Sequence, residues 1–202
     1  MSAITTGVRL PVWSKIIVFL TLSGIMGSIA TLVYGSFEIK RMAELAGNPK
    51  YVSSLGRKIV DLPEPLPAGF QFQVGMDMRF LRLVSLINRD AMQQYTFYDF
   101  PGSTNQKAKK FTEDAYAYGM NTPSVVGKFT SLIKEGSWQL LGKEMPYMLG
   151  KVKTQEGQNR QGLVASCVNE KGHAFLFYAV QVDNQKFDMA PSIELIKSIK
   201  SF

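Results

Sequence analysis

The side chains best suited to nucleophilic chemistry are His173 and Cys167, the single histidine and single cysteine of the chain. A thiol or hydroxyl nucleophile usually needs a neighbouring base, so one histidine allows at most one such site. The two residues flank a turn between two predicted strands. If that turn has two or four residues, their side chains point to opposite faces of the sheet and cannot form a dyad. We therefore predict that Cys167, within the apolar string LVASCV, is a buried small hydrophobe and that His173 is a turn or strand-edge residue.

The sequence contains no motif typical of a metal site or of a phosphate-binding loop. One histidine, one cysteine and scattered acids give no ligand spacing for zinc or calcium. Segment 136–143 departs from a phosphate-binding loop, because five residues instead of four precede its Gly-Lys pair and Glu144 stands where Ser or Thr would bind magnesium. Glu113 and Asp114 are adjacent, hence about 100° apart on a helix, and suit a solvated face better than hydrolysis by paired carboxylates. We expect no enzymatic activity, no cofactor and no metal.

The charge is unevenly distributed. The 202 residues are 46% hydrophobic and 19% charged, with 23 Lys plus Arg against 16 Asp plus Glu, a net charge of +7. Residues 1–60 hold seven Lys or Arg and two acids, a net +5, which leaves about +2 for the remainder. This composition excludes a disordered chain, and the single cysteine excludes a disulfide scaffold. A nearly neutral C-terminal part lacks the basic surface from which nucleic-acid binding gains its affinity, so we expect no nucleic-acid partner.

An uncharged stretch of 22 residues runs from 16 to 37, IIVFLTLSGIMGSIATLVYGSF. At about 1.5 Å per residue, such a helix spans a hydrocarbon core of about 30 Å. We predict a retained single-pass transmembrane helix after an N-terminal tail, residues 1–15. The alternative is a cleaved signal peptide, with Ser28 and Ala30 as the small residues before the cut. Membrane-surface contacts are predicted at the flanking aromatic and basic residues: Trp13, Lys15, Tyr34, Lys40 and Arg41.

Small residues recur along one face of this predicted helix. Close backbone approach through such a groove lets one membrane helix dock on another, although Gly, Ser and Thr are frequent in membrane helices in any case. The predicted helix-docking interface comprises Ser23, Gly24, Gly27, Ser28, Thr31 and Gly35. The positive residues on the two sides of the helix are balanced and do not fix its orientation. We expect a bacterial inner-membrane protein with a short cytoplasmic tail and its C-terminal domain in the periplasm.

A juxtamembrane segment, 38–67, follows. Asn48 before Pro49 predicts a helix cap, and the helix after it is amphipathic and basic. It suits either anionic lipid headgroups or the surface of its own domain. The string LPEPLP at 62–67 predicts an extended spacer and the domain boundary.

From residue 68 to residue 202 the pattern predicts an α+β domain, in which an antiparallel sheet of about six or seven strands carries packed helices. Alternation of apolar and polar residues, turn-forming breaks and helix-start signals define the elements. The expected strands are 70–78, 80–87, 91–100, 137–142, 147–155, 162–169 and 173–182, and the expected helices are 103–118, 123–135 and one from about 188 to the end.

This order of elements, with a "GH" turn in the last hairpin and a terminal helix that ends in "SIKSF", resembles the PsbP/Mog1-like domains over residues 70–202. The "LPAGF" entry at 66–70 is also similar to that of many membrane-anchored bacterial domains. The chain has Phe187 and Asp188 where the photosystem branch often has a tryptophan before the last helix. The resemblance implies a small α/β/α sandwich and non-enzymatic assembly or accessory work on a larger complex.

We therefore predict a non-catalytic, membrane-anchored accessory or structural subunit that docks on and stabilises a larger membrane protein complex. Its partners would be integral membrane protein subunits and membrane lipids. The alternative is a membrane-tethered domain that binds a lipid, peptide or small apolar ligand in a cleft between sheet and helix. Adaptable contacts to such a ligand would come from methionines: Met76, Met78, Met120, Met145 and Met148.

Overall fold

The computed structural model divides the chain into two compact units, residues 1–43 and 44–202. The structure describes residues 41, 44–78, 80–103, 106, 128–153 and 157–202. The transmembrane helix predicted at 16–37 lies outside these residues. In the described part of the chain, no helix combines the length and the apolar character needed to cross a membrane.

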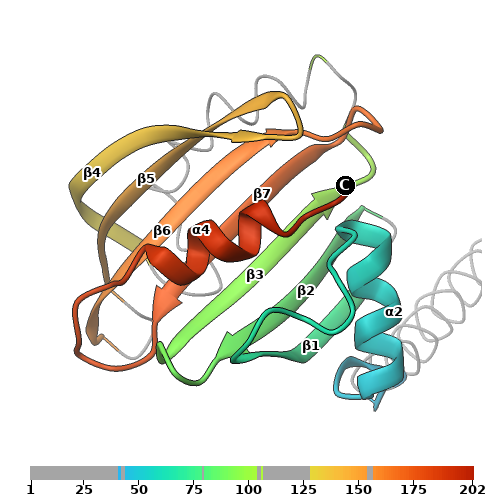
Figure 1. Ribbon diagram of the computed structural model, residues 1–202, viewed down its shortest axis with the longest axis horizontal. Coiled ribbons are helices and arrows are strands. Elements are labelled where there is room, and N and C mark those ends of the chain that lie inside the picture. Colours follow the sequence, from blue (N-terminus) through green and yellow to red (C-terminus); the bar gives the residue numbers. More distant parts are fainter. Residues whose placement is uncertain (1–40, 42–43, 79, 104–105, 107–127, 154–156) are drawn as a thin grey trace, which may run out of the picture. The chain divides into compact units, whose positions relative to one another are not determined.

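The second unit is built on a seven-stranded antiparallel sheet (Figure 1), as predicted for this part of the chain. Its strands are β1 (Phe70–Met78), β2 (Leu81–Asn88), β3 (Gln93–Phe100), β4 (Lys128–Leu140), β5 (Lys143–Lys153), β6 (Asn159–Val168) and β7 (Ala174–Gln181). They lie in the order β1-β2-β3-β7-β6-β5-β4, so β7 joins two antiparallel sets and β1 and β4 form the edges. Every neighbouring pair of strands is antiparallel.

The helix predicted at 123–135 is wrong from residue 128 onward, because β4 begins there. The prediction rested on a helix-like spacing of apolar residues, which Phe129, Leu132 and Ile133 show in the sequence. Irregularities in the β4–β5 pairing fall between Phe129 and Ser131 and between Leu132 and Lys134, so the strand does not alternate strictly. Leu132 and Ile133 remain 45% and 46% exposed on this edge strand. Of the other predicted helix, 103–118, only Ser103 and Gln106 are described residues.

Helix α2 (Pro49–Ile59) packs on its own domain. The Asn48 side chain accepts hydrogen bonds from the backbone N–H groups of Lys50 and Tyr51, which confirms the predicted cap. Val52, Leu55 and Ile59 are buried against the sheet. Of the two surfaces proposed for this helix, the domain is thus the one that it contacts. The compact unit begins at Glu44, so the proline-rich segment 62–67 lies inside it.

The close approach of α2 to the sheet depends on a glycine. A Cβ atom at Gly75 in β1 would lie 3.3 Å from the Val52 Cα atom and 3.2 Å from the Leu55 side chain. A larger side chain would therefore push the helix away from β1. The glycine explains why α2 can lie so near the strand.

Helix α4 (Ala190–Lys197) lies across the same face of the sheet (Figure 1). Its Leu195 and Ile196 are buried among the aromatic residues of β3 and β7. The segment after α4 pairs with Asp61, whose N–H donates to Ser201 O at 2.8 Å and whose carbonyl accepts from Lys200 N at 2.9 Å. The main core therefore lies between the sheet and these helices.

A second, smaller core lies on the opposite face. It contains the side chains that alternate with those of the main core, including Met148, Val164 and Tyr178. The resemblance noted above implies helices on both faces. The described helices cover one face, and the segment between β3 and β4 lies largely outside the described residues.

Candidate functional site

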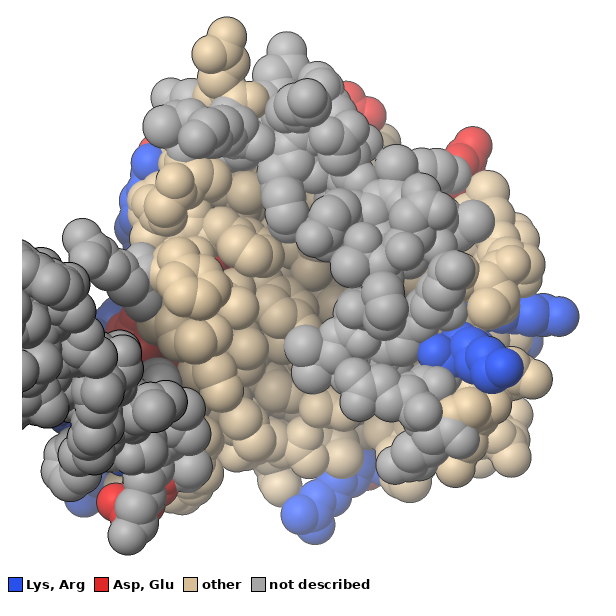
Figure 2. Space-filling model, turned by 180° about the vertical axis from the view of Figure 1, so that it is seen from behind, with Lys and Arg blue, Asp and Glu red and all other residues tan. Residues whose placement is uncertain are grey.

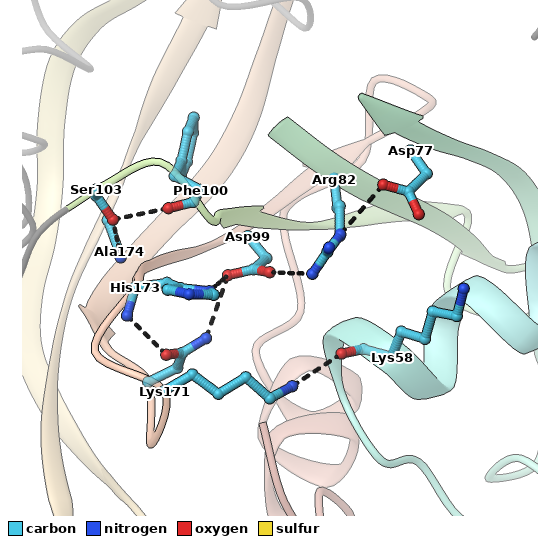
Figure 3. Close-up of polar contacts among 10 residues, drawn as sticks. Lys58, Asp77, Arg82, Asp99, Phe100, Ser103, Lys171, His173 and Ala174 are labelled. Atoms are coloured by element: carbon cyan, nitrogen blue, oxygen red, sulfur yellow. Dashed lines mark hydrogen bonds and ion pairs between the residues drawn. The ribbon is translucent and has the colours of Figure 1, made fainter. Parts of the chain in front are cut away.

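Charged side chains form a row across the helix-bearing face of the sheet, at the end near the β6–β7 turn (Figure 3). Asp77 of β1 pairs in register with Arg82 of β2, and Arg82 pairs with Asp99 of β3. Arg82 Nε lies 3.1 Å from Asp77 Oδ1, and Arg82 Nη1 lies 3.5 Å from Asp99 Oδ2. His173, directly before β7, continues the row with its Nδ1 atom 2.9 Å from Asp99 Oδ1. We call these residues, together with Asn169, the polar row.

Asp99 is the centre of the polar row. Its side chain is only 1% exposed, whereas those of Arg82 and His173 are 31% and 20% exposed. Asn169 Nδ2 donates to Asp99 Oδ1 at 3.2 Å, and Asn169 Oδ1 accepts from the His173 backbone N–H at 2.8 Å. A buried carboxylate is tolerated when it is paired and hydrogen-bonded, and Asp99 receives bonds from three side chains. The row therefore holds the β6–β7 turn against β2 and β3.

The pairing of Asp99 with His173 has the form of the base half of a catalytic triad. A triad also needs a nucleophile hydrogen-bonded to the other ring nitrogen. The nearby Ser103 hydroxyl is used elsewhere, because it donates to Phe100 O at 2.7 Å and accepts from Ala174 N at 2.8 Å. Ser103 thus fixes the chain after β3 to the start of β7. In the described residues, no group of three or more His, Cys, Asp and Glu side chains has a geometry that could hold a metal ion.

Cys167 and His173 do not lie on opposite faces of the sheet. The turn has three residues between Asn169 and His173, whose backbones pair with each other, so Cys167 and His173 have the same parity. Their side chains consequently belong to the same face, contrary to the case of two or four turn residues. Cys167 is nevertheless 5% exposed, as predicted for a buried small hydrophobe. Burial raises the pKa of its thiol to about 12, which keeps the sulfur protonated and weakly nucleophilic at neutral pH.

The sequence interpretation missed the polar row, although a signal for it exists. Asp99 follows Tyr95 and Phe97 at the parity of the buried face, where a charged residue is unexpected. Asp77 and Arg82 stand at equivalent strand-end positions of the β1–β2 hairpin. Charged residues that alternate in step with the buried residues, near the ends of paired strands, therefore predict an ion pair on the buried face of the sheet.

A second buried polar cluster closes the opposite end of β3 and β7. Gln93 Nε2 donates to Gln181 Oε1 at 3.0 Å and to Asp188 O at 2.9 Å, and the Tyr95 hydroxyl donates to Gln93 Oε1. Burial is the main cause that raises the pKa of Tyr95 above its ordinary value. This cluster links the sheet to the segment before α4. Both the Nε2 and the Oε1 atom of the buried Gln93 side chain have hydrogen-bond partners.

The other face of β1 and β2 is apolar and partly exposed. Cross-strand partners there include Met76 with Leu83, and Met78 with Leu81. Val74 is 41% exposed, and Phe80 in the β1–β2 turn is 66% exposed. In Figure 2 the described part of this face is almost entirely free of charged atoms, which lie at its margins. We call Val74, Met76, Met78, Leu81 and Leu83 of this face, together with the exposed Phe80 of the turn that joins the two strands, the β1–β2 apolar surface.

The methionines predicted as ligand contacts do not form one group. Met145 is 0% exposed in the main core, and Met148 is 1% exposed in the smaller core on the opposite face. Met76 and Met78 belong to the β1–β2 apolar surface, while Met120 lies outside the described residues. The four described methionines lie on different faces of the sheet, so the prediction that all five line one cleft is wrong.

The predicted helix-docking residues, Ser23, Gly24, Gly27, Ser28, Thr31 and Gly35, lie outside the described residues, as do Trp13, Lys15, Tyr34 and Lys40. Arg41 is described and exposed. The interface in the predicted transmembrane helix thus stays a prediction.

No known protein family has a sequence model that matches this chain, and no curated protein is significantly similar to it.

Proposed function

We propose that the protein is a membrane-anchored, non-catalytic accessory subunit that docks on and stabilises a larger membrane protein complex. The observation that carries the proposal is the β1–β2 apolar surface, with Phe80 66% exposed at the strand turn. Contiguous exposed apolar surface on a domain marks an interaction site. The uncharged stretch at 16–37 would supply the membrane anchor.

The internal use of the polar groups supports the same function. Arg82 and His173 both bind Asp99, and Ser103 binds backbone groups. These contacts stabilise the domain and leave the apolar surface as the feature suited to a partner. The small-residue face of the predicted helix would dock on a partner helix within the membrane.

The first test of this function is at the predicted anchor. The full chain is expressed at native level and extracted in mild detergent, and the proteins that co-purify with it are identified. Replacing both Gly27 and Gly35 by Leu should abolish their co-purification, because the added side chains prevent close helix approach. Ser36→Leu is the control, since it lies nine residues from Gly27 and hence about 180° around a helix. Equal recovery of partners with the double variant would contradict the proposal.

The β1–β2 apolar surface is tested in the same experiment. Phe80→Ser removes an exposed aromatic ring without opening a cavity, so the melting temperature of the domain should stay the same while partner recovery falls severalfold. Ile133→Ser, at a 46% exposed position of β4, is the matched control. Loss of partners with both variants, or with neither, would contradict a role for this surface.

A further inference from the structure

A polar pocket lies where the ends of β5 and β6 meet the loop between β7 and α4. Its volume is about 470 Å³, within the range of small-molecule sites. Side chains of Lys151, Arg160 and Lys186 line it together with Asp183, and the remaining lining is side-chain amides. An apolar ligand would leave these groups without partners, so the pocket suits a polar ligand.

The charge of the lining favours an anion. Three cationic side chains and one carboxylate give a formal charge of +2 at pH 7. Arg160 is the best positioned of the cations, because its Nη1 donates to Asn184 Oδ1 and its Nη2 donates to Gln158 Oε1. Both acceptors are uncharged amides. They orient the guanidinium group without cancelling its charge, and a planar guanidinium binds phosphate oxygens well.

The remaining lining favours hydroxyl groups beside the anion. Asp183 Oδ1 accepts from Gln181 Nε2 at 2.7 Å and from the Gln185 backbone N–H at 3.0 Å. These hydrogen bonds, with a smaller contribution from Arg160, lower the pKa of Asp183 and keep it ionised. An ionised carboxylate repels a bare anion but accepts a hydrogen bond from a hydroxyl. Asn159 carries an amide that can both donate to hydroxyls and accept from them. Gln161, whose Oε1 accepts from the Phe187 backbone N–H at 3.0 Å, can donate to them.

We infer that this pocket binds a small phosphorylated polyol, with the phosphate at Arg160 and the two lysines and the hydroxyls at Asp183 and the amides. The shared chemistry is a phosphate ester on a hydroxyl-bearing carbon chain. A soluble metabolite or the headgroup of a glycerophospholipid can supply it.

The test is isothermal titration calorimetry on the full chain in an uncharged detergent. The probes are glycerol 3-phosphate, inorganic phosphate and glycerol. Glycerol 3-phosphate should bind most tightly, because it alone satisfies both parts of the pocket. Absence of heat with glycerol 3-phosphate at millimolar concentration would overturn the site, and equal affinity for inorganic phosphate would overturn the assignment of a polyol.

Variants locate the binding. Arg160→Gln should weaken the binding of glycerol 3-phosphate by about ten- to a hundredfold, as expected for loss of charged hydrogen bonds. Lys186 is exposed, so Lys186→Gln should leave the domain folded and weaken the binding of glycerol 3-phosphate severalfold. Arg89→Gln, an exposed arginine of the β2–β3 turn, is the control and should leave the affinity unchanged. Binding that survives both pocket variants would overturn the assignment.

A further titration with dihexanoyl-phosphatidylglycerol separates the two sources. Tighter binding of this soluble lipid than of glycerol 3-phosphate assigns the pocket to a headgroup, and the reverse assigns it to a soluble phosphate ester. The measurement is independent of the proposed accessory function. Partner recovery in detergent can fail while the calorimetry succeeds, and the reverse also holds.

Discussion

Asp99 is the buried charge on which the polar row depends. It receives hydrogen bonds from Arg82, His173 and Asn169, and its side chain is 1% exposed. Removing one member of a buried pair is expensive because the partners keep their charge and lose its compensation. The partial exposure of Arg82 and His173 lets water recover part of that loss.

We therefore expect Asp99→Ala to lower the free energy of unfolding by about 3 kcal/mol, the lower end of the range for broken buried pairs. Denaturant unfolding of the full chain in detergent, followed by circular dichroism, measures this change. Asp77→Ala is the matched control. Asp77 is a 31% exposed carboxylate on the same arginine, and its loss should cost less than about 1 kcal/mol. Equal effects of the two substitutions would show that the row acts as a surface network.

At the scale of elements, β4 is held by an irregular pairing with β5. A Cβ atom at Gly150 would lie 2.5 Å from the Ser131 carbonyl oxygen and 2.8 Å from the Phe129 ring. Gly150→Ala must therefore displace backbone, which we expect to cost about 1–3 kcal/mol. Hydrogen exchange of the amides around Ser131 and Leu132 should accelerate more than that of β6 and β7. Gly102→Ala, with no heavy atom within 4 Å of its Cβ, is the control. Unchanged protection of β4 would contradict this account.

The same strand shows how far the sequence determines the elements. β1, β7 and the cap of α2 follow from local alternation and from Asn48 with Pro49, so they could be predicted. β4 could not, because its apolar residues Phe129, Leu132 and Ile133 have a helix-like spacing in the sequence, and its irregular pairing with β5 replaces the strict alternation expected of a strand. Strand order was also beyond local patterns, since β7 enters the sheet beside β3 through contacts distant in sequence.

The candidate sites depend on the same long-range pairing. Asp77, Arg82 and Asp99 come together only because three strands align in one register. The pocket at Arg160 needs the loop after β7 to meet the ends of β5 and β6. The single histidine is evident from the sequence, but its partner Asp99 is 74 positions away and cannot be identified from local patterns.

For the whole molecule, the buried acidic groups determine how stability depends on alkaline pH. Burial raises the pKa of Cys167 to about 12 from an ordinary value of 9.0, and burial is also the main cause that raises the pKa of Tyr95 and of Tyr98. Below the ordinary pKa, both the folded and unfolded forms keep these protons. Above it, the unfolded chain releases them while the folded protein retains them. Stability is therefore lost as the pH rises, first through Cys167 and then, above about pH 10, through the tyrosines.

We predict that the free energy of unfolding falls between pH 9 and pH 10.5, with about 1–2 kcal/mol of the loss caused by Cys167. Denaturant unfolding of the full chain across this range measures the slope. Cys167→Ala removes the titrating thiol, so the variant should lose about 1–2 kcal/mol less than the parent over the same window, whatever its stability at pH 8. The thiol of the parent should also react with iodoacetamide only as fast as the protein unfolds, because a protonated, buried sulfur is a poor nucleophile. Parallel pH profiles of parent and variant, or rapid alkylation of the folded protein at pH 8, would show that Cys167 is accessible and ionises normally in the folded state.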